Sequence, residues 1–351
     1  MEFWYQVIVG LIIGAIFGFI LQRGRFCMNS AFRDIILLKE FKLAKAVVVS
    51  LAVLMIGFAF FAFGGVIDLN PRIFKPVAAI VGGGIFGIGM VLAAGCASGT
   101  TYRVGEGMIG SLIAAIGLTF GAVITTWGVL SGAKTYLQDV GQVAGEVPLT
   151  LFGEFDADLT PILMLIVGLV GIALMFFFWG WPAIKKKRDA NEPLIKTDNI
   201  VETTFKKAYP WWVTGILIGI ILTAGYVASN GVIGITGGWR QINVWFMAYE
   251  EPAASVLWAG FIIFGIIIGA FASAFIAGEF KIRIPKDGLT LLKQFLGGIL
   301  MGFGAITAMG CNITNILGGV PQLSLHSILA GAFIMFGAWI AAYVLFMWRK
   351  D

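Results

Sequence analysis

The stretch Gly82–Cys96 reads GGGIFGIGMVLAAGC, and the stretch Gly297–Cys311 reads GGILMGFGAITAMGC. At an offset of 215 positions the two share five glycines, an alanine and a cysteine. Each copy is a glycine-rich apolar segment that ends in the sequence Ala-x-Gly-Cys. Small residues let membrane helices approach closely. The pair therefore predicts an internal repeat of two membrane helices, each of which ends at a cysteine.

The composition of the whole chain also indicates a membrane protein. Of 351 residues, 59% are hydrophobic and only 12% are charged, about half of the roughly 25% found in soluble domains. Apolar runs of about 20 residues can each cross the bilayer as a helix, and the alternating ten-residue strands of a β-barrel are not seen. We expect an all-α polytopic membrane protein with nine spans, at 6–22, 46–66, 77–95, 108–130, 161–181, 211–229, 254–277, 294–310 and 325–348.

The two repeat copies are the third and eighth of these spans, so they cross the membrane in opposite directions. Two copies that cross the membrane in opposite directions form an inverted repeat, as in many secondary transporters. We expect an N-terminal membrane half at 1–180 that includes a linker span near 161–181. A basic cytoplasmic loop at 182–210 and a C-terminal membrane half at 211–351 follow it.

Basic residues predict the orientation of the chain. Twenty of the 24 lysines and arginines fall on one side of the nine spans, and the other side receives four, Arg72, Lys75, Lys134 and Arg240. Because cytoplasmic loops carry the excess of basic residues, the N-terminus is expected outside and the C-terminus in the cytoplasm. This asymmetry also accounts for the net charge of +5 without binding to nucleic acid.

Both repeat copies run from the cysteine into a short polar stretch, at 96–103 and at 311–315. Irregular backbone at membrane depth is tolerated only inside protein or along a cavity, and the N-terminal end of a following half-helix favours an anion. Interfacial loops at the ends of ordinary spans are the alternative. If the segments are broken or re-entrant, the candidate substrate-lining residues are Ser98, Thr100, Thr101, Asn312 and Thr314.

The three cysteines, Cys27, Cys96 and Cys311, each follow an apolar span. A lone buried cysteine is usually a small packing residue, and a disulfide between the repeat-related pair would lock a pathway. A neutral thiol is a weak donor and a weak acceptor, which suits a soft sulfur-bearing anion that a thiolate would repel. Arg103 and Glu106, three residues apart, are expected to pair beside the polar break.

At these residues the chain resembles the YeeE/YedE family of bacterial inner-membrane transporters of sulfur compounds. The resemblance covers nearly the whole chain and rests on GRFC at 24–27, AGCASGTTYRVGEG at 94–107, GCNI at 310–313 and GGVPQLSLHS at 318–327. It implies uptake of thiosulfate, a relay of the ion between the thiols of Cys27, Cys96 and Cys311, and a small cytoplasmic TusA-like sulfurtransferase as partner. One family branch is associated with selenium.

Other functions stay open from the sequence. A thiolate could attack the outer sulfur of thiosulfate and form a cysteine persulfide, which would make the chain a membrane sulfurtransferase, although no activating base stands beside a cysteine. The substrate could also be another sulfur or selenium anion, or the chain could be a scaffold that docks a sulfurtransferase. No nucleotide motif and a single histidine are present, so we expect neither ATP hydrolysis nor a metal or cofactor site.

Overall fold

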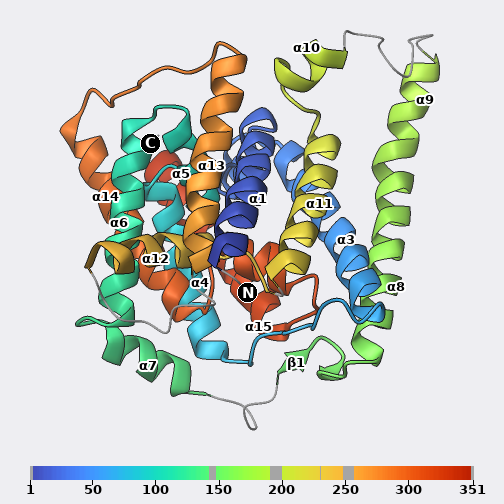
Figure 1. Cartoon of the computed structure of the whole chain (residues 1–351), viewed down its shortest axis with the longest axis horizontal. Helices are drawn as coiled ribbons and strands as arrows, with labels where there is room; N and C mark the ends of the chain where they lie inside the picture. Colours follow the sequence, from blue (N-terminus) through green and yellow to red (C-terminus); the bar gives the residue numbers. More distant parts are fainter. Residues whose placement is uncertain (1–2, 142–147, 190–199, 230, 248–256, 349–351) are drawn as a thin grey trace.

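The computed structural model describes residues 3–141, 148–189, 200–229, 231–247 and 257–348. Almost all of this part is helical (Figure 1). The α-helices are α1 (Phe3–Arg23), α2 (Met28–Leu37), α3 (Lys42–Phe63), α4 (Pro76–Leu92), α5 (Ala97–Gly105), α6 (Ile109–Thr126), α7 (Ser131–Asp139), α8 (Leu159–Met175), α9 (Trp181–Asp189), α10 (Ile200–Phe205), α11 (Trp211–Ser229), α12 (Ile235–Met247), α13 (Leu257–Ile276), α14 (Gly288–Thr307) and α15 (Leu325–Ala342).

Shorter elements complete the fold. Three π-helical segments are η1 (Phe176–Gly180), η2 (Ile313–Gly319) and η3 (Tyr343–Met347). The strands β1 (Leu149–Thr150) and β2 (Gly153–Glu154) form an antiparallel hairpin. Figure 1 shows α7 and β1 at one end of the bundle and α10 at the other, and these are called here the α7 end and the α10 end.

The prediction of nine membrane helices is confirmed. Nine helical stretches of the described chain are long and apolar enough to cross a bilayer, and each overlaps one predicted span, although Phe3–Leu37 and Pro76–Gly105 run well past the predicted ends at 22 and 95. Two of the nine contain a break, at Cys27 between α1 and α2 and at Cys96 between α4 and α5. The helices α7 and α12 and the hairpin were not predicted, and residues 190–199 of the basic loop lie outside the described residues.

The two repeat helices α4 and α14 run in opposite directions. Gln138 of α7 donates to the carbonyls of Ile306 and Thr307 at the end of α14, and α7 also packs against α4, where a Cβ placed on Gly141 would lie 3.9 Å from Pro76 at the start of α4. The same end of the bundle therefore holds the start of one repeat helix and the end of the other.

Glycines let α4 and α14 pack backbone against backbone. A Cβ placed on Gly89 would lie 2.7 Å from the Gly297 carbonyl oxygen, and one on Gly304 would lie 2.6 Å from that of Gly82. Only glycine permits helix backbones to come this close. The two repeat copies that the sequence predicts are therefore in direct contact with each other.

The contacts of the repeat with its neighbours are also duplicated. A Cβ on Gly87 would meet the carbonyl oxygen of Ile334 in α15 at 2.2 Å, and one on Gly302 would meet that of Leu118 in α6 at 2.4 Å. Leu118 and Ile334 are themselves at matching positions of the repeat once its one-residue shift is counted. Helix α8 lies apart from this arrangement at the edge of the bundle, against α3 (Figure 1).

Candidate functional site

All three cysteines follow the same backbone turn. Two residues before each cysteine, Arg25, Ala94 and Met309 have φ angles of 48°, 56° and 55°. The left-handed conformation that ends a helix is usually taken by glycine. Here it is repeated three times by residues with side chains, and the turns differ in sequence but not in geometry.

The hydrogen bonds of the three turns match as well. The residue before each cysteine donates its N–H to a carbonyl five residues earlier, as Gly95 does to Met90 and Gly310 to Ala305. Phe26 donates to Leu21 in the same way. This pattern closes the end of a helix, so each cysteine begins the segment that follows a closed helix end.

Cys27 and Cys96 form a buried pair of thiols. Their sulfur atoms are 3.7 Å apart, both side chains are fully buried, and all three cysteines of the chain are free. The Cys96 sulfur accepts the backbone N–H of Gly99 at 3.3 Å and lies 3.5 Å from the Ser98 hydroxyl. Cys96 therefore caps α5 with its sulfur, and the cap brings Ser98 to the thiol pair.

Gly99 makes this pair sterically feasible. A Cβ at position 99 would lie 2.6 Å from the Cys27 sulfur and 3.2 Å from the Cys96 sulfur. Real side chains essentially never approach so closely. Gly99 is thus the residue against which both sulfur atoms pack.

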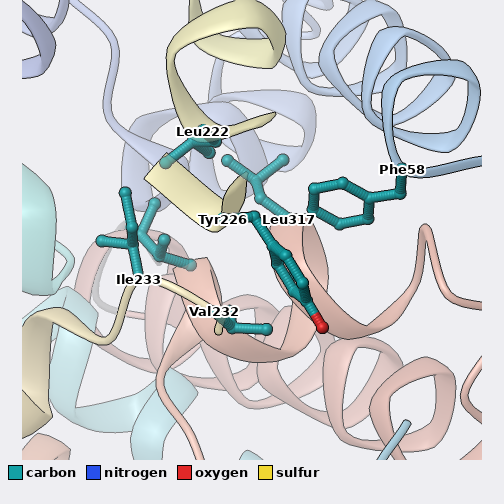
Figure 2. Close-up of a pocket in the computed structure, with 8 residues that line it drawn as sticks. Phe58, Leu222, Tyr226, Val232, Ile233 and Leu317 are labelled. Atoms are coloured by element: carbon teal, nitrogen blue, oxygen red, sulfur yellow. The ribbon is translucent and has the colours of Figure 1, made fainter. Parts of the chain in front are cut away.

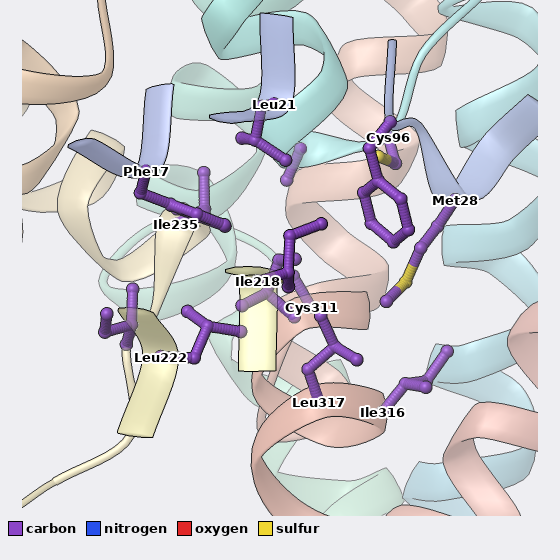
Figure 3. Packing of buried hydrophobic residues seen from close by; sticks show 14 of the residues in the cluster. Phe17, Leu21, Met28, Cys96, Ile218, Leu222, Ile235, Cys311, Ile316 and Leu317 are labelled. Atoms are coloured by element: carbon purple, nitrogen blue, oxygen red, sulfur yellow. The ribbon is translucent and has the colours of Figure 1, made fainter. Parts of the chain in front are cut away.

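Cys311 lies apart from the pair. Figure 3 shows Cys96 near Met28 and Cys311 near Leu317, at two separate places in the buried cluster. The Cys311 sulfur is 3.6 Å from the Thr314 hydroxyl. The inverted repeat separates the two cysteines that it relates, Cys96 and Cys311, and the third turn brings Cys27 to Cys96.

Cys311 lines a cavity of about 330 Å³ at the α7 end, which we call the Cys311 cavity. Arg72, Lys134 and Arg240 line it together with Thr314, and none of the described residues that line it is acidic. Burial lowers the pKa of Arg72, but arginine keeps its proton in proteins. Three positive charges around a polar, partly buried space favour a small anion.

These basic residues were not predicted from the sequence to be site residues. Arg72, Lys134 and Arg240 are three of the four basic residues that the sequence places on the outer side. Basic residues are scarce there under the positive-inside rule, so their retention was the signal that could have identified them.

A smaller cavity next to the Cys311 cavity is apolar. It has a volume of about 10 Å³ and is lined by Phe58, Leu222, Tyr226, Val232, Ile233, Ile313, Leu317 and Gly318 (Figure 2). Val232 also lines the Cys311 cavity. The hydroxyl of Tyr226 donates to the Asp68 carbonyl at 2.9 Å. This space is too small and too apolar to hold an anion, and it marks an apolar wall of the Cys311 cavity.

The side chains of two polar residues singled out in the sequence have no hydrogen-bond partner among the described residues. Both amide atoms of Asn312 and the hydroxyl of Thr100 are buried and unpaired, as are both amide atoms of Asn29, which was not among the predicted site residues. An unpaired buried polar group costs about 1–3 kcal/mol, so such groups usually have a ligand or water nearby. Thr101 is different, because it donates to Ala97 and accepts from Trp239.

The expected pair of Arg103 and Glu106 is wrong. Glu106 is buried and accepts from Gln22 at 3.0 Å, and its ion pair is with Arg25 at 3.5 Å. Arg103 instead turns back and donates to the Ala94 carbonyl at 2.5 Å. The spacing of two residues along one helix does not show whether a side chain pairs within that helix or with a residue of another helix.

Comparison with known proteins identifies the chain's family. A family model described as sulphur transport matches residues 23–340. The chain belongs to the sulphur transport family. The match contains all three cysteine turns and confirms the resemblance seen in the sequence. Membership in this family indicates a transporter and not an enzyme.

Relatives cover the chain from end to end. "Thiosulfate transporter TsuA" of Spirochaeta thermophila is 38% identical over 348 residues, which are 96% of this chain and 98% of the relative. "Thiosulfate transporter TsuA" of Escherichia coli K12 is 31% identical over 350 residues, 97% and 95% of the two chains. "Probable transporter YedE" of the same organism is 39% identical over 83 residues, 24% of this chain and 21% of its own.

Proposed function

We propose that this protein takes up thiosulfate across the bacterial inner membrane. The single observation that carries the proposal is the Cys311 cavity, where Arg72, Lys134 and Arg240 surround a thiol and no acidic residue of the described part of the chain lines the space. The names of two full-length family members, both thiosulfate transporters, support this choice of anion.

In this proposal the anion first binds in the Cys311 cavity. The positive charges attract a divalent oxyanion, and the thiol of Cys311 and the hydroxyl of Thr314 contact it weakly. Thiosulfate differs from sulfate by a terminal sulfur, which is large and polarisable. A neutral thiol discriminates for that end because it offers a soft contact without a repelling charge.

The anion then passes to the Cys27 and Cys96 pair. The unpaired buried groups of Asn312 and Thr100 support this route, since they follow Cys311 and Cys96 in their respective half-helices. Weak contacts in series allow an ion both to bind and to leave. Transfer between thiols by transient hydrogen bonds needs no covalent bond to sulfur.

The proposal includes the orientation of the chain and its partner. The α7 end, with the Cys311 cavity, faces the periplasm together with the N-terminus, and the α10 end and the C-terminus face the cytoplasm. The repeat-bearing halves, 1–180 and 211–351, then enclose the pathway, and the loop 182–210 joins them in the cytoplasm. A small TusA-like sulfurtransferase would receive the product at the α10 end.

Purified protein in liposomes tests the function. We expect saturable uptake of radiolabelled thiosulfate that an excess of sulfate does not block. Cys311→Ala and Cys96→Ala should each abolish uptake. Cys→Ser variants, which keep a donor but lose the sulfur, should retain part of it.

Ser50→Ala is the matched control, because Ser50 is also fully buried but lies on α3 and bonds only to the carbonyls of Ala46 and Gly215. Uptake in both Cys→Ala variants at the level of Ser50→Ala would overturn the relay. Absence of uptake by the unmodified protein would overturn the choice of substrate.

A further inference from the structure

A second positively charged cavity lies toward the α10 end. It has a volume of about 240 Å³ and its lining includes Arg103, Arg283, Ser111 and Gln294. We call it the Arg283 cavity. As in the Cys311 cavity, the lining contributed by the described residues includes no acidic residue. Its volume is several times the roughly 30 Å³ share of one liquid water.

The two arginines of this cavity lack acidic partners. Among the ion pairs of the described residues, none includes Arg103 or Arg283. The neighbouring Arg23 and Arg25 differ, because both pair with Glu279. The charges of Arg23 and Arg25 are thus neutralised by an acidic residue, whereas those of Arg103 and Arg283 have no acidic partner among the described residues.

The backbone places Arg283 at the cavity. Arg283 accepts the N–H of Ile109 at 3.0 Å and donates its own N–H to the Gly107 carbonyl at 2.9 Å. These two bonds fasten the segment before α14 to the segment between α5 and α6. These backbone contacts bring residues 103 and 283 to the same cavity. A basic residue that serves only as a topology signal could lie anywhere in the loop.

The start of α6 adds to the positive potential. Gly110 and Ser111 of its first turn line the cavity. The N-terminal end of an 18-residue helix carries a partial positive charge. Ser111 and Gln294 add a hydroxyl and a carboxamide, which are neutral hydrogen-bonding groups suited to an oxyanion.

Arg103 connects this cavity to the thiol pair. It lies on α5, the helix that Cys96 caps, and its Nη1 atom packs against Gly95, since a Cβ there would lie 3.4 Å away. An anion that leaves Cys27 and Cys96 toward the α10 end therefore meets a guanidinium that donates to the Ala94 carbonyl but has no acidic partner among the described residues.

We infer that the Arg283 cavity is a second binding site for the transported sulfur oxyanion, at which Arg103 and Arg283 hold the ion between the thiol pair and the cytoplasm. The inference rests on the proposed function and extends it, because it assigns a separate site to the cytoplasmic side. The chain then has one basic site on each side of its thiols. The positive charge of the Arg283 cavity offsets the attraction of the Cys311 cavity for the anion.

Membrane vesicles of defined orientation test this site. Right-side-out vesicles expose the Cys311 cavity to the medium, and inside-out vesicles expose the Arg283 cavity. We expect Arg283→Gln to raise the half-saturation concentration for radiolabelled thiosulfate about tenfold in inside-out vesicles, the loss typical of a charged hydrogen bond. Arg72→Gln should show the larger effect in right-side-out vesicles instead. Arg283→Lys should recover part of the loss.

Lys286→Gln is the matched control, since it removes an exposed charge from the same loop outside the cavity and should change neither value. Equal values for Arg283→Gln and Lys286→Gln in inside-out vesicles would overturn this inference alone. Absence of thiosulfate flux in vesicles of the unmodified protein would overturn the proposed function, and the inference with it.

Discussion

The sulfur of Cys27 lies 3.7 Å from the sulfur of Cys96, although 69 residues separate them in the chain. Each sulfur belongs to a turn that follows a closed helix end, and Gly99 lies against both. The thiol pair therefore depends on Cys27, Cys96 and Gly99. The alignment of the two repeat copies does not relate any of these three residues to another.

Gly99→Ala should impair transport without unfolding the protein. The new Cβ would lie 2.6 Å from the Cys27 sulfur, and overpacking of this kind costs about 1–3 kcal/mol. Alanine is itself the better helix former, so α5 should remain intact. We expect the rate of thiosulfate uptake in liposomes to fall about tenfold, which corresponds to about 1.4 kcal/mol.

Gly84→Ala is the control for this substitution, because a Cβ at Gly84 meets no atom within 4 Å. It should transport at the unmodified rate. An unchanged rate in Gly99→Ala would show that the spacing of the two sulfurs does not limit transport.

Arg72→Gln should weaken capture of the anion at the Cys311 cavity. Loss of one charged hydrogen-bond donor raises the half-saturation concentration about tenfold. Initial rates of uptake over a range of thiosulfate concentrations measure this effect. Lys75→Gln removes a charge from the same loop, where Lys75 faces Asp139 at 3.8 Å and not the cavity, so a similar shift in both variants would contradict the specific role of Arg72.

Glu279→Gln should destabilise the α10 end of the bundle. Glu279 pairs with Arg23, which is only 1% exposed, and with Arg25 at 2.8 Å. The variant leaves the buried guanidinium without its counter-charge, and we expect a loss of about 1–3 kcal/mol in unfolding free energy. Thermal unfolding in detergent measures it, and Glu40→Gln, which breaks the exposed pair with Lys42, should stay within about 1 kcal/mol of the unmodified protein.

The effect of Glu279→Gln should also depend on pH. Burial opposes ionisation, but the hydrogen bond from Gln22 and the charges of Arg25 and Arg23 hold the pKa of Glu279 below its usual value. A lowered pKa gives stability that is complete above the usual glutamate value of about 4.3 and is lost as pH falls through the lowered one. The difference between the two proteins should therefore be full at pH 7 and shrink in acid. A difference that grows in acid would contradict this assignment.

Gly87→Ala and Gly302→Ala should cause similar losses of stability. The added methyl groups would lie 2.2 Å and 2.4 Å from backbone oxygens of α15 and α6, so helices must separate at a cost of about 1–3 kcal/mol or more. Thermal unfolding of both variants beside Gly84→Ala measures the cost. A large loss in one variant and none in the other would contradict the structural equivalence of the repeat copies.

The nine spans and the inverted repeat were predictable because they depend on hydropathy and on glycine spacing along the chain. The partners of individual side chains were not. Arg103 and Glu106 are well spaced for a helical pair, yet Glu106 bonds to Gln22 and Arg25 of another segment. The three matching turns were also hidden, because Arg25, Ala94 and Met309 adopt a conformation for which glycine is the usual sequence signal.

The crossing of α4 and α14 has a mechanical consequence. Its closest approaches join main chain to main chain through glycines, and at these points no change of side-chain rotamer can let one helix slide over the other. We therefore expect the two repeat copies to move together as one rigid unit, which disfavours large rocking of one half against the other. Motion that admits an ion would then be confined to the short segments that follow the cysteines, and conduction would resemble that of a narrow pore with local gates.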